Sequence, residues 1–347
     1  MDRKAWRIFA AGALSLLLIP LWVGLFFALP AAPRPLPPSA KTPPRPQEVP
    51  QVAVDVRLYD PQTGQIQILS LDDYVQGVVA AEMKPGFHLE ALKAQAVAAR
   101  SYAVLHLKGW GGAGCPQQPA ADICADSQTH QAWKAVAQDE KAEPGFLTQV
   151  QEAVEATRGW VLTYRGVVAE TTFYAASGGR TEDAREVWHR AVPYLVSVPS
   201  PEESPYDGEK ATFMWPQVAA AFGLPLSQFP ASPSRRFQIR DYTAGGRTRT
   251  VLVGGEIFSG VEVRQRLGLR STWIVGVEAT DARLTLTTRG WGHGVGLSQY
   301  GAQSMAQKGA TFEEILDHYY PGTQLTPLAY AQPPRPQTEH EGEGAGR

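Results

Sequence analysis

Nine prolines occur between Pro30 and Pro50, and this density limits most strongly what the first part of the chain can form. Proline fixes φ and lacks a backbone N–H, so neither a helix nor a central strand is compatible with it. Residues 30–50 are therefore predicted to be a semi-rigid, polyproline-like linker. A globular domain is expected at residues 51–331. The Pro-, Glu- and Gly-rich residues 332–347 are predicted to form a disordered tail.

An uncharged apolar run, residues 8–29, precedes this linker and follows the basic residues Arg3, Lys4 and Arg7. Its length matches the roughly 20 residues that span a bilayer as a helix. The basic flank favours an N-terminus that stays in the cytoplasm. We therefore predict a signal anchor, a transmembrane helix within residues 1–29, with the globular part outside the cytoplasm. A cleaved signal peptide, which would give a secreted protein, is the alternative.

The overall charge of the chain gives no electrostatic reason to expect nucleic acid as a partner. Lys and Arg number 32 against 34 Asp and Glu, a formal net charge of −2, whereas phosphate binding needs a basic surplus. With only two cysteines there is no disulfide framework and no CxxC zinc ribbon. The seven histidines form no HExxH pair, which excludes zinc hydrolases of that type.

Strand and helix patterns do not alternate regularly along the globular part. Alternating apolar residues predict strands or hairpins at residues 52–69, 160–164, 167–174, 237–253 and 274–288. Helices are predicted at residues 72–83, 89–107 and 148–157, and two more in the last 50 residues. Asp72 or Asp73 is expected to cap the first helix, and a capping box of Thr311 and Glu314 opens the last. This order predicts an α+β fold of mixed helices and antiparallel strands.

Glu82 stands out in the first predicted helix. It follows Val75 by seven residues, which places it on the apolar stripe of Leu71, Val75, Val78 and Val79. It also lies in the last turn, where the helix dipole disfavours a further negative charge. Both effects favour a protonated carboxyl group near neutral pH, which is what a general acid requires.

Other interpretations of Glu82 stay open from the sequence. The side chain can turn to solvent at a fraying helix end, or pair with Lys84 or Lys93. Arg100 on the following helix, if it pairs closely with Glu82, would lower the pKa of the acid instead.

Four long segments carry information beyond these single residues. In chain order they read LDDYVQGVVAAEMKPGFHLEALKAQAVAARSYAV, ETTFYAASGGRTEDA, VRQRLGLRSTWI and RGWGHGVGLSQYGAQSMAQKGATFEEILDHYYPGTQL. Together they strongly resemble the SpoIID/LytB family of stage II sporulation protein D and amidase enhancers. Several long segments in the expected order are far more specific than one short motif. The resemblance implies a SpoIID-like domain at residues 51–331.

This resemblance implies a peptidoglycan lytic transglycosylase in cell-wall remodelling or sporulation. Glu82 matches the family's essential acid in its Ala-Glu-Met segment. The reaction cuts glycan strands between N-acetylmuramic acid and N-acetylglucosamine and leaves a 1,6-anhydro-muramic end. One carboxyl group serves as acid and then as base, so the second carboxylate of an ordinary glycosidase is dispensable. Asp73 and Glu90, the nearest carboxylates in the sequence, both fit helix starts or the surface.

Two functions without catalysis remain as alternatives. The chain could bind glycan and stimulate a separate N-acetylmuramoyl-L-alanine amidase, as the LytB branch implies. It could also serve as a scaffold in a division or sporulation complex. The presence of Glu82 favours the enzyme over both.

The matched segments also imply substrate-binding residues: Gln95, Arg100, Tyr174, Ser177, His293 and Gln299. Alternating glycines at residues 290–296 permit close backbone approach by a ligand, and a purely structural glycine turn is the alternative. The segment does not fit GxGxxG, so no dinucleotide cofactor is expected.

Cys115 and Cys124 are expected to form a disulfide, because the domain is predicted to lie in an oxidising compartment. The resemblance implies an alternative, a structural zinc ion held by His106, Cys115, Cys124 and His130. Related sequences often carry Thr-His-Cys-Gln here, whereas residues 128–131 read Gln-Thr-His-Gln. This departure favours the disulfide, and no cofactor is predicted.

Overall fold

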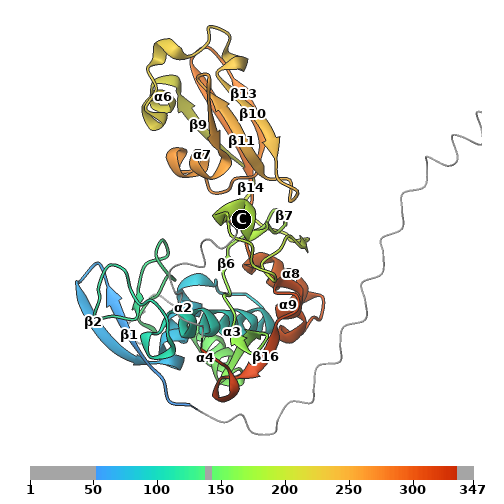
Figure 1. The fold of residues 1–347 in the computed structure, drawn as a ribbon. Helices are drawn as coiled ribbons and strands as arrows, with labels where there is room; N and C mark the ends of the chain where they lie inside the picture. The colour runs from blue at the N-terminus through green and yellow to red at the C-terminus, as the bar shows by residue number, and fades with distance from the viewer. Residues whose placement is uncertain (1–51, 137–142, 334–347) are drawn as a thin grey trace, which may run out of the picture. The chain divides into compact units, whose positions relative to one another are not determined.

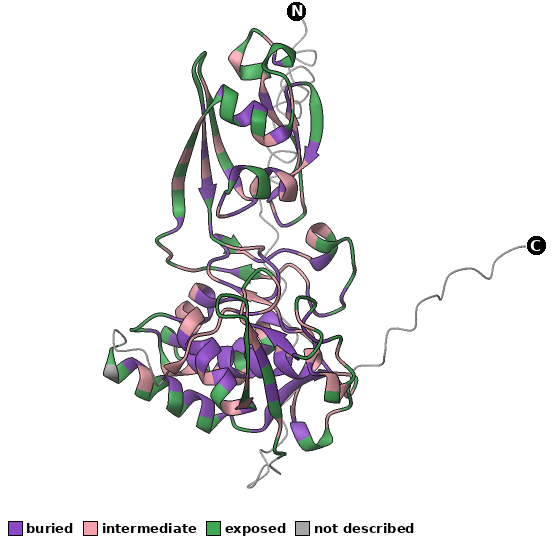
Figure 2. Cartoon of the chain, turned by 90° about the vertical axis from the view of Figure 1, so that its left-hand side faces the viewer, coloured by how far each residue is buried: buried purple, intermediate pink, exposed green. Residues whose placement is uncertain are grey.

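Two hydrophobic cores organise the described residues, 52–136 and 143–333, of the computed structural model (Figure 1). The first core forms around α2 (Leu71–Glu82), α3 (Leu89–His106) and α4 (Pro144–Ala156). Buried residues cover most of α3, as the purple helices of Figure 2 show. Many of them are alanines, whose small side chains let neighbouring helices approach closely. The helices α8 (Gln299–Gln307) and α9 (Phe312–Tyr319) also pack on α3.

Local sequence signals fix the helix ends. Ser70 caps α2, since its hydroxyl accepts a hydrogen bond from the Asp73 amide. The expectation that Asp72 or Asp73 is the cap was therefore wrong, because Ser70 is the residue with extended backbone angles at the start of the helix. The predicted capping box of Thr311 and Glu314 at the start of α9 is confirmed.

The strands near the first core are mostly short. β1 (Asp55–Asp60) and β2 (Gln65–Ser70) form the predicted antiparallel hairpin. β4 (Trp160–Tyr164) pairs antiparallel with β16 (Gln324–Pro327) and with β5 (Val167–Val168). The single strand predicted at 167–174 is divided, because β5 pairs with β4 whereas β6 (Phe173–Tyr174) pairs with β15 (Leu297–Ser298).

The fold is a mixture of helices and strands, as predicted, but its strands are not all antiparallel. β3 (Ile123–Cys124) joins β1 in parallel, and β6 joins β15 in parallel. Both pairs connect segments far apart in the sequence, which hairpin patterns cannot reveal. The β6–β15 pair brings the middle family segment against the C-terminal one.

The second core contains two antiparallel sheets, drawn in yellow and orange in Figure 1. One sheet has the order β10 (Phe237–Tyr242), β11 (Thr248–Val253), β12 (Glu256–Ser259). The other has the order β13 (Ile274–Ala279), β14 (Arg283–Arg289), β9 (Asp207–Met214). Helices α6 (Trp215–Phe222) and α7 (Gly260–Leu267) complete it. The sequence predicted strands here but did not separate this second core.

Short elements connect the two cores in the sequence: β7 (Gly179–Arg180), α5 (Ala184–Trp188) and β8 (Pro199–Ser200). The described residues include the 3-10 turns η1 (Lys108–Trp110), η3 (Leu226–Gln228), η4 (Pro233–Arg235) and η5 (Leu328–Tyr330).

The predicted signal anchor, residues 1–29, and the linker, residues 30–50, lie outside the described residues. Among the residues that are described, none of the helices has the length and apolar character to cross a bilayer. The predicted tail, 332–347, is mostly outside as well. Its first residue, Gln332, still pairs with the fold, because its amide donates to the Gly166 carbonyl at 2.8 Å.

Candidate active site around Glu82

Glu82 is the last residue of α2 and is half-buried. Its Oε2 accepts a hydrogen bond from Gln299 Nε2 at 3.1 Å, and its Oε1 accepts one from the Ala132 amide at 3.3 Å. Burial raises the pKa of this carboxyl group, and the two hydrogen bonds limit the rise because they favour the ionised form. Both donors are neutral. The predicted direction of the shift, a raised pKa for Glu82, therefore agrees with its surroundings.

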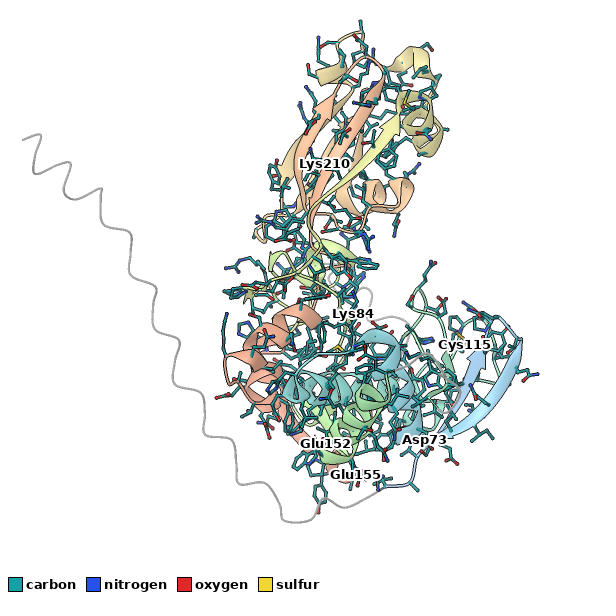
Figure 3. The ribbon with its side chains drawn as sticks, turned by 180° about the vertical axis from the view of Figure 1, so that it is seen from behind. Asp73, Lys84, Cys115, Glu152, Glu155 and Lys210 are labelled. Atoms are coloured by element: carbon teal, nitrogen blue, oxygen red, sulfur yellow. A yellow bond between two sulfur atoms is a disulfide. The ribbon has the colours of Figure 1, made fainter. Side chains whose placement is uncertain are left out.

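The charged partners considered for Glu82 are engaged elsewhere. Lys93 forms an ion pair with Glu90 at 2.6 Å, and Lys84 donates to the Tyr206 hydroxyl at 2.6 Å. Lys84, labelled in Figure 3, follows Glu82 by two residues but forms no ion pair with it in the described structure. The alternative that Glu82 pairs with Lys84 or Lys93 was therefore wrong.

Arg100 lies at the opposite end of α2 from Glu82. Its Nη2 contacts Asp72 Oδ1 at 3.3 Å, in the first turn of α2, whereas Glu82 ends that helix. Ten residues of helix separate these positions by about 15 Å. The fully buried guanidinium also donates to the Thr157 carbonyl at 2.9 Å, at the C-terminus of α4. These contacts tie α3 to α2 and α4 and leave Arg100 outside the Glu82 site.

Gln95 lies fully buried in α3, and neither polar atom of its amide has a hydrogen-bond partner among the described residues. The amide is enclosed in the first core. Of the six residues implied as substrate-binding, Gln299 is the one whose side chain the structure hydrogen-bonds to Glu82.

Ser177 and His293 have hydrogen-bond partners within the protein, whereas the buried Tyr174 hydroxyl has none among the described residues. The fully buried Ser177 hydroxyl donates to Glu202 Oε2 at 2.8 Å. His293 Nδ1 accepts from the Val295 amide at 3.1 Å, and Nε2 lies 3.1 Å from the Phe173 carbonyl, which assigns a neutral ring protonated on Nε2. Burial, with the nearby cation of Arg264, lowers the pKa of His293 to about 4. Burial raises the pKa of Tyr174 well above its usual value.

The glycines of residues 290–296 are required by the protein's own packing. A Cβ at Gly292, where φ is +120°, would lie 2.6 Å from the Tyr174 Cβ. A Cβ at Gly296, where φ is +79°, would lie 2.1 Å from the Thr172 carbonyl oxygen. The structural alternative for this segment is therefore confirmed. The atoms that lie close to these glycines belong to Tyr174 and Thr172 of the same polypeptide.

The second hydrogen-bond donor to Glu82 comes from the loop at residues 131–133. No sequence motif had connected this loop with the site. Gln131 accepts a hydrogen bond from the buried Tyr74 hydroxyl at 2.8 Å, and the adjacent Ala132 amide donates to Glu82. Trp133 then packs on α2, where a Cβ at Gly77 would lie 2.0 Å from the indole Nε1. A glycine inside a helix costs about 1 kcal/mol relative to alanine. The presence of Gly77 within the predicted helix was therefore the one sequence feature that could have indicated a close packing partner at this position.

A disulfide between Cys115 and Cys124 supports the same loop, with Cα atoms 5.4 Å apart. Figure 3 shows Cys115 near the β1–β2 hairpin, to which β3 adds Cys124. The Cys124 amide donates to His130 Nδ1 at 3.2 Å, and the rings of His130 and His106 meet edge to face at 4.8 Å. Within residues 52–136 and 143–333, no group of three or more His, Cys, Asp or Glu is arranged to hold a metal ion.

We expect the purified protein to contain no free thiol, since both cysteines are bonded to each other. Replacing both cysteines with serine is expected to lower the free energy of unfolding by about 2–3 kcal/mol, as for other short disulfide loops. Urea denaturation measures this loss. One zinc ion per chain by metal analysis, together with two titratable thiols, would contradict the disulfide and restore the zinc alternative.

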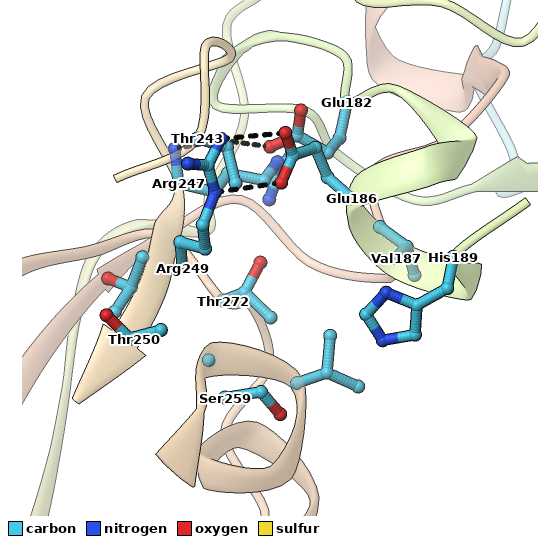
Figure 4. Close-up of a pocket in the computed structure, with 13 residues that line it drawn as sticks. Glu182, Glu186, Val187, His189, Thr243, Arg247, Arg249, Thr250, Ser259 and Thr272 are labelled. Atoms are coloured by element: carbon cyan, nitrogen blue, oxygen red, sulfur yellow. Dashed lines mark hydrogen bonds and ion pairs between the residues drawn. The ribbon is translucent and has the colours of Figure 1, made fainter. Parts of the chain in front are cut away.

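A separate pocket of about 260 Å³ lies beside α5 and β11 (Figure 4). Two of its charged groups form an ion pair, Arg249 with Glu186 at 2.8 Å, and Glu182 accepts a hydrogen bond from the neutral Thr243 hydroxyl. Burial raises the pKa of Glu182. Neither Glu82 nor Gln299 lines this pocket, so it is not part of the candidate active site.

Comparisons with known proteins agree with the motifs around this site. Residues 59–164 match the family model SpoIID, described as stage II sporulation protein, and this range includes Glu82 and the disulfide loop. The chain is 36% identical over 277 residues to stage II sporulation protein D of Bacillus subtilis, covering 79% of each chain. It is 36% identical over 283 residues to the protein of the same name from Bacillus amyloliquefaciens, also covering 79% of each.

A more distant similarity leads to a larger protein. The amidase enhancer of Bacillus subtilis is 27% identical over 304 residues, which cover 73% of this chain and 40% of that protein. The similarity to the two proteins named stage II sporulation protein D covers most of this chain, at a level that unrelated sequences do not reach. On this evidence the chain belongs to the SpoIID family.

Proposed function

We propose that this protein is a peptidoglycan lytic transglycosylase with Glu82 as its catalytic acid and base. The observation that carries the proposal is the state of Glu82: a half-buried carboxyl group, with a pKa raised by burial, that neutral donors alone hold in place. Burial shifts such a group towards its protonated form, which is the form that can give a proton to a leaving oxygen.

The proposed reaction needs one carboxyl group and no water. Glu82 gives its proton to the glycosidic oxygen as the bond from that oxygen to C1 of N-acetylmuramic acid breaks. The carboxylate then takes the proton of the C6 hydroxyl, and O6 bonds C1 to close the 1,6-anhydro ring. Gln299 and the Ala132 amide hold the carboxylate during the intermediate stage, because each donates to one of its oxygens.

The products distinguish this reaction from hydrolysis. The full chain in mild detergent would be incubated with purified glycan strands, with and without stem peptides, and the products identified by mass spectrometry. Anhydro-muramic ends support the proposal. Hydrated reducing ends would contradict it and indicate a second carboxylate. Glu202 would then be tested, since it accepts a hydrogen bond from Ser298, the residue before Gln299.

The second candidate function is an amidase enhancer that binds glycan and stimulates a cell-wall amidase without cutting strands. The similarity to a protein named amidase enhancer favours it. Glycan binding without cleavage, together with a faster N-acetylmuramoyl-L-alanine amidase in a mixed assay, would select this function. A protein that serves only as a scaffold would neither cleave the strands nor make the amidase faster.

The proposed setting is the outer face of the cytoplasmic membrane. This part of the proposal rests on the sequence alone, on the apolar run of residues 8–29 and the proline-rich linker that follows it. A linker of 21 residues, Pro30 to Pro50, could extend about 60 Å in a polyproline conformation, which would let an anchored domain reach strands of the wall.

The pH dependence of cleavage tests the role of Gln299. Cleavage requires protonated Glu82, so the rate is expected to fall as the pH rises through its raised pKa. Replacing Gln299 with leucine removes a hydrogen bond that favours the ionised form, so the pKa of Glu82 rises further and the alkaline limb of the pH–rate profile moves to higher pH.

Gln307→Leu is the matched control, because Gln307 is exposed on the same helix. Its profile should coincide with that of the parent. An alkaline limb that moves to lower pH in Gln299→Leu would contradict the proposed hydrogen bond to Glu82.

A further inference from the structure

A cluster of aromatic and cationic side chains adjoins the Glu82 site, and we name it the aromatic wall. It consists of Phe87, Tyr206, Trp291 and Tyr300, with the cations of Lys84 and Arg270. The rings meet edge to face, with centroids 5.2 Å apart for Phe87 and Tyr300 and 4.7 Å apart for Tyr206 and Trp291. Such geometry is favourable for aromatic pairs.

The wall is joined to the proposed catalytic carboxyl group through two short stretches of chain. Lys84 follows Glu82 by two residues, and Tyr300 follows Gln299 directly. The Lys84 ammonium then links the wall together, because it donates to the hydroxyl of Tyr206 at 2.6 Å and lies 3.4 Å from that of Tyr300. The wall is therefore built on the same two stretches of chain that carry Glu82 and its hydrogen-bond donor Gln299.

Trp291 is the exposed aromatic ring of the wall, at 38% of its surface. Its backbone is fixed, because its amide donates to the Ala176 carbonyl at 2.8 Å and its carbonyl accepts from the Ala176 amide at 3.0 Å. The Arg270 guanidinium lies 4.2 Å from the indole centroid, and Glu209 holds this arginine through Nε at 2.7 Å. These contacts hold the large apolar ring of Trp291 in one orientation at the surface. A ligand therefore does not have to order this side chain, which lowers the entropic cost of binding.

We infer that the aromatic wall binds aminosugar rings of the glycan strand next to the bond that Glu82 cleaves. A sugar ring presents an apolar C–H face and a rim of hydroxyl groups. The indole of Trp291 matches the face, and the Tyr300 hydroxyl and the Lys84 ammonium match the rim, while the buried Tyr206 supports Trp291 and Lys84 from behind. In this role Trp291 is a binding residue, and Lys84 positions the two tyrosines relative to the end of α2. The inference rests on the proposed function.

The test measures binding apart from cleavage. The full chain carrying Glu82→Gln, in mild detergent, is titrated calorimetrically with the hexamer of N-acetylglucosamine and with purified glycan strands. Adding Trp291→Ala is expected to raise the Kd for both about tenfold, which corresponds to about 1.4 kcal/mol. Trp291→Phe keeps an aromatic face and is expected to recover most of the affinity.

Trp188→Ala is the matched control. Trp188 is exposed to a similar extent, 36%, but packs on His293 outside the wall. Its removal should change the Kd less than twofold. Equal losses from the two tryptophans, an unchanged Kd in Trp291→Ala, or no binding of either ligand by the parent would each overturn the inference. Thermal melting of each variant identifies any loss that arises from unfolding.

The outcomes for the wall and for the catalytic proposal are separable. Binding that depends on Trp291 in a protein that cuts no strand would retain the wall and reject the transglycosylase. Cleavage to anhydro ends with a KM that Trp291→Ala leaves unchanged would retain the transglycosylase and reject the wall.

Discussion

Replacing Glu82 with glutamine is expected to lower the rate of strand cleavage about a thousandfold or more, since one carboxyl group carries both proton transfers. Glutamine keeps the shape of the side chain but can neither give nor take the proton. Release of anhydro-muramic ends, followed by mass spectrometry, measures the loss.

This variant should remain folded. Burial raises the pKa of Glu82 in the folded protein, so the contribution of this group to stability is fully present below its unfolded-state pKa and is lost as the pH rises through its folded-state pKa and the buried carboxyl ionises. A neutral glutamine avoids that cost, and the melting temperature at neutral pH should be equal or higher.

Glu90→Gln is the control for the loss of a nearby carboxylate. Glu90 pairs with Lys93 and accepts from the Phe312 amide at 2.8 Å, and these partners lower its pKa. It should retain cleavage at close to the parental rate. Full cleavage by Glu82→Gln would reject the proposed role of Glu82.

Replacing Arg100 with methionine is expected to lower the free energy of unfolding by about 3 kcal/mol, because it leaves buried polar partners without a donor. The guanidinium is fully buried and serves Asp72 and the carbonyls of Val154 and Thr157. Arg158 also pairs with Asp72, at 3.1 Å, which keeps the loss at the lower end of the range for broken buried pairs. Urea denaturation measures it.

The same experiment separates a structural arginine from a substrate-binding one. Arg249→Met removes an exposed cation that pairs with Glu186 and Asp241, and it should cost less than about 1 kcal/mol. The folded fraction of Arg100→Met should cleave strands with the parental pH profile. Undiminished stability with lost cleavage would return Arg100 to the substrate site.

Local features of the fold were predictable from the sequence, because short-range interactions determine them. The period of Leu71, Val75, Val78 and Val79 predicted which face of α2 is buried, and these residues are buried. The same period placed Glu82 on that face. The Thr311 capping box and the β1–β2 hairpin also depend on neighbours a few residues apart, and both formed as expected.

For residues implied only by the family segments, the position in the fold was less predictable. A matching segment indicates that a side chain is important, but it does not indicate which other residues that side chain contacts. Ser177 and His293 come from such segments, yet their polar atoms bond Glu202 and the Phe173 carbonyl. Gln299 comes from the same C-terminal segment as His293 and contacts Glu82. Six residues of chain separate these two side chains and place them in different surroundings.

The sequence by itself determined the family, the helix that carries Glu82 and the apolar face on which it lies. Only the tertiary structure decided what surrounds that carboxyl group. Its two donors come from Ala132 and Gln299, 50 and 217 residues away along the chain. Such contacts depend on how Trp133 packs on Gly77 and on the parallel pairing of β6 with β15. Periodicity reports only neighbours within a few turns, so it cannot specify contacts between segments so far apart.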